Sequence, residues 1–172
     1  MDKNKYKSAC FEYLVDILAE KNNGLQGFST LKLIKLLFLT VGVSSSEKKQ
    51  DLTTIFNKFV AMPFGPVESD VYNDIRYDKL KKYSITSSEC RFKDGNETDL
   101  VVNETDEACI RKSVDSLLTK NPNILNCEPF ELVDISHKWS CWQICFELAL
   151  SLGRRSIDIP SRMIQKSVRY YK

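Results

Sequence analysis

The sequence predicts a mainly α protein, a compact multi-helix single domain spanning residues 1–172 with one small β-hairpin element. Apolar residues recur at steps of three and four over most of the chain, which is the pattern of helices with one buried face. Only six glycines and five prolines are present among 172 residues, so little of the chain is suited to long linkers. The apolar share of 42% and the charged share of 28% are ordinary for a globular protein.

Two helices are expected in the first quarter of the chain. Apolar positions from Tyr6 to Leu18 form one stripe, and residues 22–24 (Asn-Asn-Gly) end it. A second helix begins near Ser29, whose hydroxyl can cap the free amides of the first turn. Because residues 31–41 are apolar on nearly every face, this second helix should lie at the centre of the core.

The middle of the chain mixes signals. Residues 52–64 fit either a helix or a strand, and the pattern does not decide between them. Gly65-Pro66 predicts the start of a helix, with Pro66 at its first position and Val71 and Ile75 on its buried face. Two extended runs, 89–92 and 99–102, flank Asp94-Gly95-Asn96 and predict a β-hairpin.

Helical periodicity returns in the second half. A helix is expected over residues 105–118 with Asn103 as its cap, and another begins at Pro129. Pro160 opens the last predicted helix, which continues to Tyr171. Its apolar side would face the protein, and its other side would carry Arg162, Lys166 and Arg169.

Nothing in the sequence indicates export or a membrane span, so a cytoplasmic location is expected. Residues 1–7 are polar and lysine-rich, unlike a secretory peptide, and the most apolar stretch, 31–43, contains two lysines and is too short to span a bilayer. The six cysteines form no CxxC pair and are expected to be free thiols. The net charge of +2 predicts no general attraction to nucleic acid or membrane.

One set of residues raises the question of a metal or thiolate site. His137, Cys141 and Cys145 follow one another at four-residue steps, so on an unbroken helix they would share a face. Three ligands still lack a fourth, and the alternative is a buried histidine beside two core cysteines. Because the sequence also has no phosphate-binding glycine loop and no paired-carboxylate signature, we expect no enzyme, no metal and no cofactor.

The basic C-terminal segment admits three interpretations. Arg162, Lys166 and Arg169 could follow a phosphate backbone, dock on an acidic protein, or form the solvated face of a terminal helix. The nucleic-acid interpretation therefore stays as an alternative function, a regulator that uses this helix.

Three stretches, taken in order, resemble a known family. They are Leu31–Leu39 (LKLIKLLFL), Phe59–Val67 (FVAMPFGPV) followed by Val71-Tyr72, and Leu132–Lys138 (LVDISHK) followed by Trp139 and Trp142. Together they are similar to the helix, the Gly-Pro-Val signature and the Ser-His…Trp signature of the Panacea domain, the SocA-like antitoxin family. Phe64 stands where the family more often has tyrosine.

This resemblance implies a mainly helical antitoxin that neutralises a cognate toxin protein by direct contact. Some members instead deliver the toxin to a protease, which remains a further alternative. The positions carried over as partner-binding or motif residues are Lys35, Phe64, Gly65, Pro66, Val67, Tyr72, His137, Trp139 and Trp142. Physical reasoning assigns Gly65-Pro66 to a turn, and makes Phe64 and Tyr72 either exposed anchors or core residues.

Overall fold

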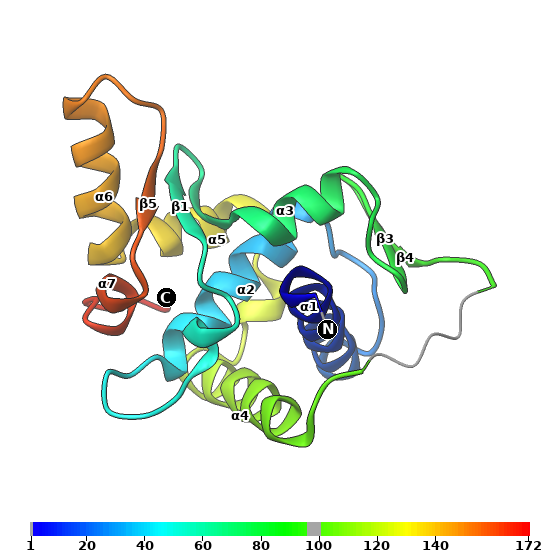
Figure 1. Ribbon diagram of the computed structural model, residues 1–172. Helices are drawn as coiled ribbons and strands as arrows, with labels where there is room; N and C mark the ends of the chain where they lie inside the picture. Colours follow the sequence, from blue (N-terminus) through cyan, green and yellow to red (C-terminus); the bar gives the residue numbers. More distant parts are fainter. Residues whose placement is uncertain (1, 96–100) are drawn as a thin grey trace.

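The computed structural model describes residues 2–95 and 101–172, and within them the protein is mainly α with two small antiparallel sheets (Figure 1). The predicted fold class is therefore confirmed. Helix α2 (Thr30–Ser44) runs through the centre of the core. It is surrounded by α1 (Lys3–Asn22), α3 (Ser69–Arg76), α4 (Glu104–Lys120) and α5 (Pro129–His137).

The helices begin where capping residues satisfy free backbone amides. The Asp2 carboxylate accepts from the amide of Asn4 at the start of α1, and the Ser29 hydroxyl accepts from the amide of Lys32 in α2. Asn103 caps α4 in the same way, as predicted. The expected central position of the second helix is confirmed, because residues 32–42 of α2 are all buried.

A three-stranded sheet lies beside these helices in the order β2-β1-β5. Strand β1 (Phe59–Met62) pairs antiparallel with β2 (Gly65–Glu68) through a tight hairpin, and on its other side with β5 (Ile157–Ile159). The undecided segment is thus a 3-10 turn, η1 (Leu52–Thr54), followed by a strand. The prediction that Pro66 opens a helix is wrong: Pro66 lies in β2, an edge strand, where its missing N–H is tolerated.

A second hairpin joins β3 (Tyr83–Ile85) to β4 (Cys90–Phe92). The sequence placed Cys90–Phe92 in a hairpin, but with the wrong partner, because the strand it pairs with precedes it. The proposed partner run 99–102 falls partly outside the described residues, and its described part, Val101 and Val102, is not in a strand.

The last part of the chain forms an arm. After the turn η2 (Ile124–Asn126) and α5, helix α6 (Ser140–Ser151) packs on β5, and α7 (Ser161–Gln165) follows. Figure 1 shows α6 at the edge of the molecule, with β5 and β1 on one side of it. The predicted long C-terminal helix is wrong: α7 ends at Gln165, and residues 166–172 run as irregular chain across the ends of α2 and α6.

None of the described helices is long and apolar enough to cross a membrane. All six cysteines are free, as expected, and four of them are buried.

Candidate functional site

The residues of the three motifs come together around the β1–β2 hairpin. Helix α2 supplies Lys35, the hairpin supplies Met62 to Pro66, the end of α5 supplies Ser136 and His137, and the first turn of α6 supplies Trp142. These positions are far apart in the sequence, and the packing of α2 and α5 against β2 brings them side by side.

Lys35 is fully buried beneath the hairpin. Its ammonium group donates to the carbonyl oxygen of Pro66 at 2.8 Å, and among the described residues it forms no ion pair. Burial without a neighbouring carboxylate lowers the pKa of Lys35 to about 7, because the charged form is poorly solvated there. Lys35 therefore fastens α2 to the hairpin and is not available at the surface.

Gly65 occupies the tightest point of the hairpin. Its φ of +95° lies in the region that L side chains rarely adopt, and a Cβ there would stand 2.4 Å from the Ser136 hydroxyl oxygen and 3.0 Å from the Lys35 ammonium nitrogen. The glycine is required both by its conformation and by the close approach of α2 and α5. The expectation that Gly65 has a turn role is consistent with this geometry.

His137 and Trp142 hold the other side of the hairpin. The two rings stack with centroids 3.9 Å apart and an interplanar angle of 12°. The indole N–H of Trp142 donates to the carbonyl of Met62 at 2.9 Å. The His137 Nε2 atom is buried and has no hydrogen-bond partner within the described residues. Burial, together with the nearby charge of Lys35, lowers the pKa of His137, so the ring is neutral at pH 7.

Trp139 has a structural role in the core. It is fully buried, its indole N–H donates to the Tyr170 carbonyl at 2.7 Å, and its ring lies where any side chain at Gly42 would stand. Trp139 thus fixes the C-terminal segment to α2 and has no free surface for a partner.

The hairpin carries exposed apolar side chains around a hollow of about 340 Å³. The hollow is lined by residues of α2, by residues of the hairpin that include Val67, and by Tyr72 of α3. Phe64 is 60% exposed and Phe130 of α5 is 62% exposed, and their rings meet edge to face with centroids 6.0 Å apart. We name the exposed group of Met62, Phe64, Tyr72 and Phe130 the hairpin surface.

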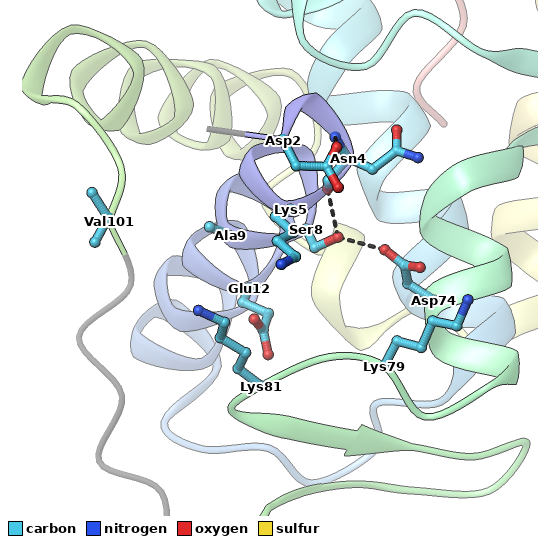
Figure 2. Close-up of a pocket in the computed structure, with 10 residues that line it drawn as sticks. All are labelled: Asp2, Asn4, Lys5, Ser8, Ala9, Glu12, Asp74, Lys79, Lys81 and Val101. Carbon is cyan, nitrogen blue, oxygen red and sulfur yellow. Dashed lines mark hydrogen bonds between the residues drawn. The ribbon is translucent and has the colours of Figure 1, made fainter.

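A second hollow, of about 480 Å³, lies between α1 and the segment that joins α3 to β3 (Figure 2). Both acidic and basic side chains line this hollow, and the buried carboxylate among them, that of Glu12, already accepts hydrogen bonds from the protein. The Glu12 carboxylate accepts from the backbone amides of Lys82 and Tyr83, and Asp74 accepts from the Ser8 hydroxyl. Because these groups serve the fold, this hollow is a weaker candidate for a binding site than the hairpin surface.

The basic residues of the C-terminal segment do not form the expected helix face. Arg162 and Lys166 both approach Glu47, at 3.0 and 3.6 Å. The Arg169 guanidinium donates to the backbone carbonyls of Val43 and Ser45, which end α2. Arg169 is thus a structural clamp, and these contacts weigh against a nucleic-acid site at these three residues.

The common helix face that a metal or thiolate site at His137, Cys141 and Cys145 would need does not form. His137 ends α5 and Cys141 lies in α6, with a break at residues 138–139, so the unbroken helix needed for a common face is missing. Burial raises the pKa of Cys141 to about 11, and the Cys145 thiol lies 3.5 Å from the Met163 sulfur. Among the residues that the structure describes, no cluster of three or more His, Cys, Asp or Glu has metal-binding geometry.

Sequence reasoning missed three residues of this site. Ser136 was quoted within a motif but not assigned to the site, although its hydroxyl packs against Gly65 while donating to the Val133 carbonyl. Met62 likewise stands within the Phe59–Val67 motif without being assigned to the site, and Phe130 lies in the helix predicted from Pro129. The local signal for Phe130 is its place directly after Pro129 in the first turn of a helix, where a side chain often points to solvent.

A comparison with protein-family models supports the grouping of these residues. The model described as Antitoxin SocA-like, Panacea domain, matches residues 33–143, which contain the three motifs and the hairpin but not most of α6, β5 and α7. Searches of curated proteins and of solved structures found no match. Since the matched segment covers well over half of the chain, the protein belongs to the SocA-like antitoxin family with a Panacea domain.

Proposed function

We propose that this protein is the antitoxin of a toxin–antitoxin pair, and that it neutralises a protein toxin by direct, non-catalytic binding through the hairpin surface. The observation that carries the proposal is the group of exposed side chains formed by Met62 and Phe64 of the hairpin, Tyr72 of α3 and Phe130 of α5, around a hairpin fixed from below by buried motif residues. Large, rigid aromatic side chains around a hollow are typical of the residues that dominate binding energy in protein interfaces.

The buried motif residues support this proposal because they hold the hairpin in one conformation. Lys35, Gly65 and Ser136 are packed against one another, and Trp142 holds the Met62 carbonyl, so the exposed side chains above them are held in place before binding. A preorganised surface loses less conformational entropy when a partner docks. In this view the motif preserves a platform, while the exposed positions on it select the toxin.

The test is co-expression with the product of the neighbouring reading frame. Wild-type protein should restore growth and co-purify with that product. Phe64→Ser and Tyr72→Ser should each weaken the complex about 10- to 100-fold, the range expected for interface aromatic residues. Phe92→Ser and Tyr77→Ser are matched controls, because both residues are exposed to a similar or greater extent on other parts of the surface.

Toxin abundance separates the two ways of neutralising. Unchanged toxin levels in rescued cells would support occlusion by binding, whereas falling levels would indicate delivery to a protease. A neighbouring product that is harmless, or whose toxicity this protein cannot relieve, would refute the antitoxin proposal. Equal rescue and equal affinity for the hairpin variants and their controls would refute the assignment of the surface.

A further inference from the structure

Helix α6 leaves a row of large apolar side chains uncovered. Its buried side, which includes Cys141, Cys145 and Ala149, packs on β5 and β1. Ile144, Leu148 and Leu152 follow one another at four-residue steps along a neighbouring ridge, and all three are exposed.

The row continues into the C-terminal segment. Ser140 precedes Ile144 by four residues on the same ridge, and it exchanges two hydrogen bonds with the backbone of Val168, at 3.2 and 2.8 Å. Val168, the most exposed of the large apolar residues, is thereby fixed at the start of α6. We name Val168, Ile144, Leu148 and Leu152 the α6 row; from Ser140, which holds Val168, to Leu152 the helix rises by about 18 Å.

The area of the α6 row is sufficient for a docking surface. Four half-exposed aliphatic side chains present roughly 400 Å² of apolar surface, at on the order of 100 Å² each. That is about half of the 800 Å² that each partner contributes to a standard interface, and interfaces are a little more than half apolar. The row therefore has the apolar content of one side of a typical interface.

The charges around the row indicate what covers it. Residues 138–172 contain seven basic and two acidic side chains, a net +5 in a chain whose total is +2. Lys138 stands before the first turn of α6, and Arg154 and Arg155 follow its last turn. All three are exposed, and none forms an ion pair within the described ranges 2–95 and 101–172.

Two other occupants fit this charge pattern less well. A second copy packed antiparallel would bring Arg154 of one chain to the end that carries Lys138 of the other, and a parallel copy would pair the arginines with themselves. Both arrangements oppose like charges. A nucleic acid would satisfy the basic ends but would leave the apolar row between them without a partner.

We propose that the α6 row is a docking site for an acidic amphipathic helix of the toxin, with apolar side chains on the row and carboxylates against Lys138, Arg154 and Arg155. This inference rests on the proposed antitoxin function and adds the chemistry of the toxin segment. The first turn of α6 lies next to the hairpin, because the indole N–H of Trp142 donates to the Met62 carbonyl, whereas the row faces away from that contact.

The position of the site also relates to the family match. The matched segment ends at residue 143, one residue before the α6 row starts on the helix. The hairpin surface therefore belongs to the part that the family model describes, whereas the α6 row lies on the arm beyond it. A docking site on the arm is suited to selecting one toxin among those that a shared platform could accept.

The experiment compares Leu148→Ser with Leu150→Ser in binding to the purified neighbouring product. Both leucines are on α6 and are exposed to 47% and 59%, but a two-residue step turns the side chain by about 200°, so Leu150 lies off the row. We expect Leu148→Ser to weaken binding at least 10-fold and Leu150→Ser to change it less than twofold.

Charge reversal tests the second half of the inference. Arg154→Glu combined with Arg155→Glu should slow association at least 10-fold at low salt and flatten its salt dependence. Lys112→Glu combined with Lys120→Glu, two exposed positions on α4, is the matched control and should leave both quantities unchanged.

The outcomes are distinguishable. A wild-type protein that binds no neighbouring product overturns both the antitoxin function and this inference. Tight wild-type binding that is unchanged by the charge reversal, with equal affinities for Leu148→Ser and Leu150→Ser, overturns the α6 site alone. Loss on charge reversal without loss in Leu148→Ser overturns the amphipathic helix in favour of a purely polyanionic partner.

Discussion

Replacing Gly65 by alanine tests whether the hairpin is fixed by the close approach of α2 and α5. The new Cβ would stand 2.4 Å from the Ser136 hydroxyl oxygen and 3.0 Å from the Lys35 ammonium nitrogen, and the residue would keep a φ of +95°. The conformational strain costs about 1–2 kcal/mol. Overpacking against buried side chains adds about 1–3 kcal/mol.

The expected loss of about 2–5 kcal/mol is a large part of the stability of a domain of this size. It corresponds to a decrease in melting temperature of roughly 4 to 20 °C. Urea unfolding followed by tryptophan fluorescence measures it, because Trp139 and Trp142 are both buried in the native state.

Gly27→Ala is the matched control. Gly27 has a φ of +79°, but a Cβ there would meet nothing within 4 Å, so this variant carries the conformational strain alone. Gly65→Ala should therefore be the more destabilising by about 1–3 kcal/mol. Combining Gly65→Ala with Ser136→Ala should cost less than the sum of the two single changes, since the second removes the nearest atom. Equal losses for Gly65→Ala and Gly27→Ala would refute the reasoning.

Two further predictions concern the buried lysine and the C-terminal clamp. Lys35→Met should alter how stability depends on pH: the unfolded chain keeps this proton up to about pH 10.5 while the folded protein releases it near pH 7. Between about pH 7 and pH 10.5 the unfolded state therefore binds more protons than the folded state. The free energy of unfolding of the wild type, relative to that of Lys35→Met, should for this reason rise from pH 7 to pH 10, by at most about 1.4 kcal/mol per pH unit. Parallel urea titrations check this, and a pH-independent difference would contradict it. Arg169→Ala should lower stability by about 1–3 kcal/mol, because two partly buried carbonyls at the end of α2 lose a charged donor, whereas Arg162→Ala, exposed at the surface, should stay within about 0.5 kcal/mol. Thermal unfolding of the pair measures the contrast, and equal effects would mean that the Arg169 contacts contribute nothing.

Local sequence signals predicted the helices well where caps and periodicity agree. The α2 helix follows a serine cap and is apolar all round, and α4 follows Asn103, so both start where short-range physics places them. The start of α5 was equally predictable from the sequence, because Pro129 is suited to the first position of a helix.

The strands were harder to predict because their partners are remote. The pairing of β1 with β5 joins residues 96 to 100 positions apart, and nothing within four residues of either strand encodes it. Pro66 has a φ suited to a helix start as well as to an edge strand. Pro66 lies in a strand because β1 pairs beside it, and the helix begins later, where the Glu68 carboxylate accepts from the backbone amide of Val71.

The C-terminal segment shows how tertiary contacts override periodicity. Apolar residues at Ile164, Val168 and Tyr171 fit a helix, yet the chain leaves the helix after Gln165. Hydrogen bonds from Arg169 to the end of α2 and from Val168 to Ser140 replace the bonds that a continued helix would make. The candidate site was predictable as a set of motif residues, but not which of them would be buried, since that depends on the remote packing of α2, α5 and the hairpin.

The order of the β2-β1-β5 sheet has a consequence for synthesis in the cell. Strand β1 emerges with its hairpin partner, but its other edge stays unpaired until β5 has been made about 95 residues later. At 5–20 residues per second the ribosome needs roughly 5 to 20 s to do so. During that interval the nascent chain carries an open strand edge, which can recruit other chains or a chaperone.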